Sequence, residues 1–216
     1  MKTILVEFKT SLLITLVFAV LLCGAYPLAV WAGGQLFFRQ KANGSLVMDP
    51  DGTVRGSALL AQNFSSDRYF HPRPSAAGTG FDASSSNATN LGPTSDKLAN
   101  GIHAKDAAGR DVDDLNNFDG IKDLVKAYRA ENGLGADESV PADAVTRSAS
   151  GLDPDISVQN ATLQAARVAM ARKLPVVQVE ALVASHVQDR DLRIFGQPRV
   201  NVLLLNLALD QESAGR

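Results

Sequence analysis

The hydrophobic pattern is strongest near the amino terminus, where a long apolar run lies between charged residues. No residue from Thr10 to Phe38 is charged, and Lys9 and Arg39 flank this run. As an α-helix the run would be about 43 Å long, compared with roughly 30 Å for the hydrocarbon core of a bilayer. The pattern predicts a short tail at 1–9, a transmembrane helix at 10–34 and a polar domain at 35–216.

A cleaved signal peptide is the alternative interpretation of this segment. Lys2 and Lys9 would form its basic region, the run from Leu12 to Cys23 has a suitable length, and Val30-Trp31-Ala32 resembles a cleavage site. The apolar run continues beyond that point, and aromatic residues gather toward its far end as they do at a membrane interface. We therefore favour an uncleaved anchor.

Small side chains recur every fourth residue along the predicted membrane helix. Such stripes let two membrane helices approach closely, although small residues are also common in any membrane helix, so both interpretations stay open. Basic residues are nearly balanced on the two sides of the run, so local charge does not set its orientation. The stripe consists of Ser11, Thr15, Ala19 and Cys23.

The rest of the chain mixes the periodicities of strands and helices, which predicts a small α+β domain. Asp49-Pro50-Asp51-Gly52 is a turn signal. The segment 71–118 is polar and too long for an ordinary connection, so it is either disordered or a functional surface loop. The predicted elements are a strand at 53–62, a helix from the cap Asp119 to Gly133, a helix from the cap Ser157 to Leu174, a third helix over Val176–Val187 and a buried strand over Val200–Leu209.

Composition and charge exclude several classes of function. The net charge of the 216-residue chain is -2, so no basic field favours nucleic acid. Phosphate-binding loops, dinucleotide-binding glycines, zinc motifs and a nucleophile elbow are all missing from the sequence. His71, His103 and His186 have no partner at motif spacing, and Asp153-Pro154-Asp155 is interpreted as a turn. The sequence predicts no catalytic residues and no metal site.

Several segments in order along nearly the whole chain resemble the C subunit of the Kdp potassium-transporting ATPase of bacteria and archaea. The most specific is Ser148-Ala149-Ser150-Gly151-Leu152-Asp153, and Gly196-Gln197-Pro198-Arg199-Val200-Asn201-Val202 is another. Ser84–Asn87 and the long polar stretch Asn100–Asn117 depart from the family pattern. The residues that carry the resemblance include Arg73, Pro74, Ser75, Asn90, Ser150, Gly151, Asp153 and Asn206.

The resemblance implies an accessory, non-catalytic subunit of an ATP-driven, high-affinity potassium uptake complex in the bacterial inner membrane. The implied partners are a channel-like potassium-translocating subunit, a P-type ATPase subunit and a small hydrophobic subunit, besides membrane lipid. The implied subunit crosses the membrane once, serves assembly and stability, and carries its C-terminal domain outside the cytoplasm.

Two mechanisms follow from the resemblance. In the first, the subunit is a catalytic chaperone that raises the ATP affinity of the ATPase subunit, with ATP held in a ternary complex and Gln159 and Gln164 as contact candidates. In the second, the domain caps the channel-like subunit outside the cell and tunes potassium entry. Without a phosphate-binding loop, we favour interpreting both glutamines as helix surface residues. A cleaved, secreted binding protein is the alternative from a different class.

Overall fold

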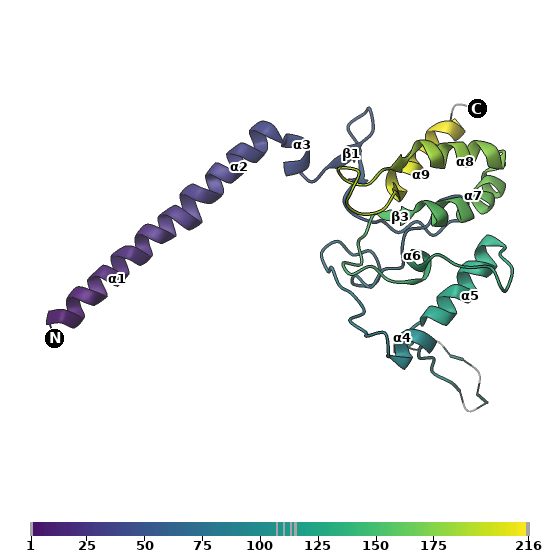
Figure 1. The fold of residues 1–216 in the computed structure, drawn as a ribbon, viewed down its shortest axis with the longest axis horizontal. Helices are drawn as coiled ribbons and strands as arrows, with labels where there is room; N and C mark the ends of the chain where they lie inside the picture. Colours follow the sequence, from purple (N-terminus) through teal and green to yellow (C-terminus); the bar gives the residue numbers. More distant parts are fainter. Residues whose placement is uncertain (1, 107, 110, 113, 115, 215–216) are drawn as a thin grey trace. The chain divides into compact units, whose positions relative to one another are not determined.

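The computed structural model of the chain separates into two compact units, one ending at Ser57 and the other beginning at Ala58. Figure 1 traces the chain from the helical N-terminal unit to the α+β C-terminal unit. The described residues are 2–106, 108–109, 111–112, 114 and 116–214. The predicted fold class, an apolar N-terminal helix followed by a small α+β domain, is confirmed.

The N-terminal unit is dominated by one apolar helical run, Thr3–Phe37, which is long and apolar enough to cross a membrane. It comprises α1 (Lys2–Val20), a π-helical turn η1 (Leu21–Ala25) and α2 (Tyr26–Phe37). None of its most apolar window is buried inside the structure. The helix therefore extends beyond the predicted bounds 10–34 at both ends.

The π-turn has a local cause in Pro27, near the start of α2. Proline has no backbone N–H, so it cannot donate to the carbonyl of Cys23 four residues earlier, and a wider turn accommodates the lost bond. Ser11, Thr15 and Ala19 lie on α1 in α-helical register, and the hydroxyl of Thr15 donates to the Ser11 carbonyl at 2.8 Å. Cys23 lies inside the π-turn. The wider turn rotates Cys23 relative to the other three residues of the predicted stripe.

A short helix α3 (Arg39–Ala42) and a hairpin of β1 (Leu46–Met48) and β2 (Val54–Ser57) complete this unit. The predicted turn is present, with the Asp49 N–H donating to the Thr53 carbonyl at 2.9 Å. The predicted strand 53–62 is too long. It ends at Ser57 because the following residues turn away, and the Ala61 N–H donates to the carbonyl of Leu152 instead of a strand partner.

The C-terminal unit is built on a three-stranded antiparallel sheet with the order β3-β5-β4. Strand β5 pairs with both neighbours, so Val200 faces Ile156 on one side and Val187 on the other. The strands are β3 (Asp155–Ser157), β4 (Val187–Gln188) and β5 (Arg199–Asn201), and the helices are α4 (Asp96–Asn100), α5 (Ile121–Asn132), α6 (Ala142–Val145), α7 (Val158–Arg172), α8 (Val176–Ser185) and α9 (Val202–Ala214).

Helices α7, α8 and α9 lie together and enclose most of the core (Figure 1). Val168, Val179 and Leu205 contribute one fully or almost fully buried side chain from each helix. Phe70 belongs to the same cluster although it comes from the long irregular segment that precedes the helices. That segment, 58–95, contains neither helix nor strand, although its first residues, 58–62, are part of the predicted strand 53–62.

The buried strand predicted over Val200–Leu209 is wrong. Only Arg199–Asn201 is a strand, and the leucine-rich remainder forms α9. The switch occurs at Asn201, whose side-chain oxygen accepts from the N–H of Leu204 at 3.1 Å and thereby caps the helix. A helix surrounded by core on most sides shows the same continuous apolar run as a buried strand.

Most predicted helix ends are confirmed, and one cap is corrected. The Ser157 hydroxyl accepts from the N–H of Asn160, and Gly133 ends α5 in a left-handed conformation. The N-cap of α5 is Gly120 and not Asp119, and the Asp123 carboxylate accepts from the Gly120 N–H at 2.9 Å. Helix α8 stops at Ser185, before the predicted Val187, which belongs to β4. Asp153-Pro154-Asp155, interpreted as a turn, leads into β3 at Asp155.

Candidate functional site

A buried polar network joins one face of α7 to α5 and to the irregular segment that carries Phe70. Asn160, Gln164 and Arg167 lie at intervals of four and three residues, which places them on the same face of α7. Each of the three is at least nine-tenths buried. Polar groups are stable at such depth only when their hydrogen bonds are satisfied.

Gln164 uses both ends of its amide. Its oxygen accepts from the backbone N–H of His71 at 2.7 Å and from Arg167 at 2.8 Å. Its nitrogen donates to the His71 carbonyl at 3.1 Å and to Asn160 at 2.9 Å. The prediction that Gln164 is a surface residue is wrong, because this side chain pairs with the backbone of a segment far away in sequence.

Arg167 is the centre of the charged part of the network. Its guanidinium donates to Asn132 and to the carbonyls of Asp67 and Tyr69, and it lies 3.3 Å from the Glu131 carboxylate. His71 makes a second contact to Glu131, at 2.7 Å. Burial opposes ionisation of Glu131, but the hydrogen bond from His71 and the positive charge of Arg167 help to outweigh it, and the pKa of Glu131 lies below its usual value.

The network borders a small pocket of about 170 Å³ between α5, α7 and the irregular segment. The Tyr128 hydroxyl donates to Asn160 at 2.8 Å beside it, and burial raises the pKa of Tyr128. The polar wall therefore consists of groups already bonded to one another. The lining residues are His71, Pro72, Pro74, Leu124, Ala127, Tyr128, Glu131, Ala144, Asn160 and Gln164.

The two predicted ATP contacts do not lie together. Gln159 is exposed on α7, whereas Gln164 is buried. A separation of five residues corresponds to roughly 140° around a helix, so the side chains point in different directions. No described contact connects the two glutamines.

Most of the family-motif residues hold the irregular segment against the rest of the unit. Arg73 pairs with Asp153 at 2.9 Å, and the Ser75 hydroxyl donates to the Gly151 carbonyl at 2.6 Å. Pro74 lines the pocket. These contacts span more than 70 positions of sequence, so they fix tertiary structure.

Gly151 shows why this motif tolerates little change. Its φ is +70°, and a Cβ placed on it would lie 2.7 Å from the backbone nitrogen of Ala77 and 2.8 Å from the carbonyl oxygen of Asn87. Only glycine fits both the conformation and the close approach. The preceding residue, Ser150, accepts at its carbonyl from the Asn87 N–H at 3.1 Å.

The remaining two motif residues are Asn90 and Asn206. The Asn206 side chain accepts from the Phe70 N–H and donates to the Phe70 carbonyl, both at 2.9 Å. Asn90 adopts a positive φ of 53°, which asparagine tolerates better than most residues, and its side chain donates to the Ala88 carbonyl. Asn206 thus anchors the buried aromatic residue of the segment to α9.

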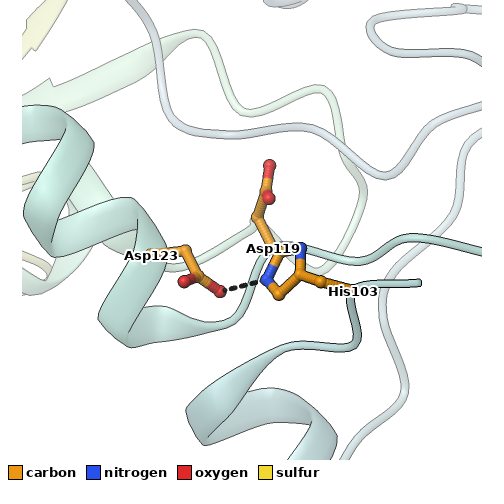
Figure 2. A group of neighbouring side chains, drawn as sticks. All are labelled: His103, Asp119 and Asp123. Atoms are coloured by element: carbon orange, nitrogen blue, oxygen red, sulfur yellow. Dashed lines mark hydrogen bonds and ion pairs between the residues drawn. The ribbon is translucent and has the colours of Figure 1, made fainter. Parts of the chain in front are cut away.

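A second cluster, His103, Asp119 and Asp123, has the residue types of a divalent-cation site, with its ligand atoms within 4.8 Å of one another. Figure 2 shows the His103 ring and the Asp123 carboxylate facing each other, joined by a 3.0 Å hydrogen bond. The same Asp123 oxygen also accepts from Gly120 at the start of α5. This pairing gives the cluster a structural role, which is to tie the residues around His103 to that helix.

We expect the attachment of His103 to α5 to weaken above neutral pH. The hydrogen bond to Asp123 raises the pKa of His103, and the same bond lowers the pKa of Asp123. The contribution of His103 is full below its unfolded pKa of about 6.5 and is lost as pH rises through the higher folded value. The contribution of Asp123 is lost in acid, as pH falls through its lowered pKa.

Amide hydrogen exchange at Ile102 and Phe118, which bridge each other beside the cluster, measures this effect. After correction for intrinsic rates, protection should fall from pH 6 to pH 9, and a His103→Gln variant should show no such fall. Equal pH dependence in the two proteins would contradict the assignment to His103.

Sequence reasoning missed the polar network because its partners are distant in the chain. The available signal was the spacing of Asn160, Gln164 and Arg167 on one predicted helix, which indicates a polar face. Their connection to His71, 93 positions from Gln164, is visible only in the structure.

The comparisons with known proteins agree with these motifs. The family model described as KdpC: K+-transporting ATPase, c chain, matches residues 8–211. Curated relatives named "Potassium-transporting ATPase KdpC subunit" include one from Mycobacterium tuberculosis (strain ATCC 25618 / H37Rv), 49% identical over 95% of this chain and 98% of its own length. Another, from Nitratidesulfovibrio vulgaris (strain DSM 19637 / Miyazaki F), is 48% identical over 96% of this chain and 95% of its own.

A third relative of the same name, from Caulobacter vibrioides (strain NA1000 / CB15N), is 50% identical over 89% of this chain and 87% of its own. The match to the family model, residues 8–211, spans most of the apolar helix and the segments that carry the motif residues. The chain therefore belongs to the KdpC family, the c chains of K+-transporting ATPases.

Proposed function

We propose that the chain is an accessory, non-catalytic subunit of an ATP-driven potassium uptake complex, anchored in the inner membrane by its N-terminal helix. The observation that carries the proposal is the apolar helix Thr3–Phe37, which leaves its apolar side chains exposed along its length. Lipid and the membrane helices of partner subunits are the surroundings that such a helix requires. Family membership identifies the type of complex.

The partners in this proposal are the channel-like potassium-translocating subunit, the P-type ATPase subunit and the small hydrophobic subunit. On α1, Ser11, Thr15 and Ala19 offer the close approach for one of their helices. Cys23, in the π-turn, contributes less to that contact than the sequence alone indicates.

For the C-terminal unit we favour a role in assembly and stability outside the cytoplasm over a role as ATP chaperone. Gln164 supports this choice because its amide is fully engaged within the chain, and a nucleotide would have to break those bonds. Gln159 remains an exposed candidate for ATP contact in a ternary complex with the ATPase subunit. A cap that tunes potassium entry is a further role for a domain placed outside the cell.

Accessibility to a membrane-impermeant maleimide in intact cells tests the placement of the C-terminal unit. We would introduce Ser139→Cys, at an exposed position, into a Cys23→Ala background. We expect Ser139→Cys to be labelled in intact cells as completely as in opened cells. A matched Thr3→Cys variant at the other end of the helix should be labelled only after opening.

The reverse pattern would place the C-terminal unit in the cytosol and contradict the proposal. ATP would then reach the domain, and Gln159→Ala would become the first variant for nucleotide-binding measurements. Release of a mature chain that lacks the apolar helix, seen by mass spectrometry, would instead favour the secreted binding protein.

A further inference from the structure

The loop between β4 and β5 displays three large apolar side chains that the described residues of the C-terminal unit leave exposed. The exposed fractions are 83% for Leu192, 71% for Ile194 and 63% for Phe195. We call residues 191–195 the apolar tip. Scattered exposed apolar residues are ordinary, but three within four positions of one exposed loop are not.

The backbone of the apolar tip is closed in a conformation that favours display over burial. Asp191 and Phe195 bridge each other through two backbone hydrogen bonds of 2.9 Å. Leu192 and Arg193 between them have φ values of 53° and 63°. Glycine, asparagine and aspartate are the residues that usually take such paired left-handed positions. A leucine at position 192 costs free energy and gains no burial within this chain. This cost indicates that the side chain contacts something outside the chain.

The charges around the apolar tip leave two cations, Arg190 and Arg193, without a carboxylate partner among the residues that the structure describes. Asp191 lies 3.2 Å from Arg199, and Arg190 donates to Gln197 at 2.9 Å. Arg193, at the end of the turn, has no ion pair or side-chain hydrogen bond to any residue that the structure describes. Asp189, a neighbouring acid without a described ion pair, offsets one of these two positive charges.

We propose that the apolar tip inserts into the headgroup region of the lipid bilayer, with Leu192, Ile194 and Phe195 at the acyl boundary and Arg193 at the lipid phosphates. This inference rests on the proposed anchoring of Thr3–Phe37 in the membrane. Peripheral membrane elements combine an apolar surface with basic side chains in this way. Long basic side chains near a membrane keep their charge at the interface while their stems contact apolar groups.

Two further observations favour lipid over another protein chain. Residues 38–57 connect the apolar helix to the C-terminal unit, and 20 residues span at most about 70 Å even when fully extended. With the helix anchored, this connection always keeps the C-terminal unit within that distance of a bilayer. The apolar tip is also small, with three exposed apolar side chains. A stable protein interface buries about 800 Å² on each partner, which is more than three side chains supply.

Lipid-dependent fluorescence quenching in the assembled complex tests the proposal. An environment-sensitive fluorophore is attached at Ile194→Cys in a Cys23→Ala background, and the complex is reconstituted into phosphatidylcholine–phosphatidylglycerol vesicles with or without bromine on the acyl chains. We expect brominated lipid to remove roughly half of the emission, since such elements lie about 5–10 Å into the headgroup boundary. The same fluorophore at Ser139→Cys should be unaffected. Arg193→Glu should reduce the quenching at position 194.

Each other outcome has one meaning. Emission from position 194 that is insensitive to bromine but quenched by aqueous iodide would overturn the inference by showing an exposed loop. Emission shifted to the blue but insensitive to both quenchers would overturn it in favour of burial against a partner subunit. A fluorophore at Val17→Cys, within the apolar helix, tests the membrane anchor separately. Strong quenching by brominated lipid at position 17 but not at position 194 would overturn only the inference about the apolar tip. No quenching at position 17 would contradict the proposed anchor itself.

Discussion

Replacing Arg167 with methionine is expected to lower the free energy of unfolding of the C-terminal unit by about 3–5 kcal/mol. Methionine preserves most of the stem volume, so the loss comes from the guanidinium. Its removal leaves the buried side-chain oxygens of Asn132 and Gln164 each without one donor, and the half-buried bonds to the carbonyls of Asp67 and Tyr69 are lost as well. An unsatisfied buried acceptor costs roughly 1–3 kcal/mol. Glu131 would also lose its ion pair with Arg167.

Urea unfolding of the full chain in mild detergent, followed by circular dichroism, measures this loss. Arg68→Met is a matched control because Arg68 is exposed and makes no described side-chain contact. The control should stay within about 0.5 kcal/mol of the parent protein. A loss below about 1 kcal/mol for Arg167→Met would show that water replaces the guanidinium, and that the network does not hold the irregular segment.

The elements that sequence predicts well are those with local causes. The Ser157 cap, the Gly133 stop and the apolar N-terminal helix each depend on residues within a turn or two of one another. The prediction that Asp119 caps α5 is wrong for an equally local reason. Gly120 takes that place, because Asp123 accepts from its N–H.

Helix α9 could not be predicted because its environment decides between two structures. An apolar run bounded by Pro198 and Asp210 satisfies both a buried strand and a helix packed on most sides. The deciding contact is the Asn201 cap on Leu204, together with the packing of α9 against α8. Neither has a periodic signature in the sequence.

The polar network illustrates the same limit for functional residues. Glutamine on a helix is most often exposed, and Gln159 follows that expectation while Gln164 does not. Gln164 differs from Gln159 because the backbone of His71 lies beside it and bonds to its side chain. The spacing of residues along the sequence does not predict this contact. The resemblance located the Arg73 and Asp153 motifs, and the structure supplies their physical reason, a contact between distant segments.

Replacing Phe70 with alanine is expected to destabilise the C-terminal unit by about 3–5 kcal/mol, the usual cost of removing a buried aromatic ring. Phe70 has no exposed surface and is among the largest fully buried side chains. The Asn206 side chain bonds both the N–H and the carbonyl of Phe70. The backbone therefore cannot move inward to fill the cavity without breaking these two hydrogen bonds of 2.9 Å. Incomplete relaxation of this kind places a substitution at the costly end of its range.

Phe195→Ala is the matched control, since it removes the same ring from an exposed position and should change the stability in detergent by no more than about 0.5 kcal/mol. A double-mutant cycle with Asn206→Ala then tests whether the ring and the backbone clamp act together. If Asn206 prevents relaxation, the double variant should lose less stability than the two single variants combined, by at least about 0.5 kcal/mol. Strict additivity would mean that the cavity persists without the clamp, and that the irregular segment is held mainly by its contacts to Gln164 and Arg167.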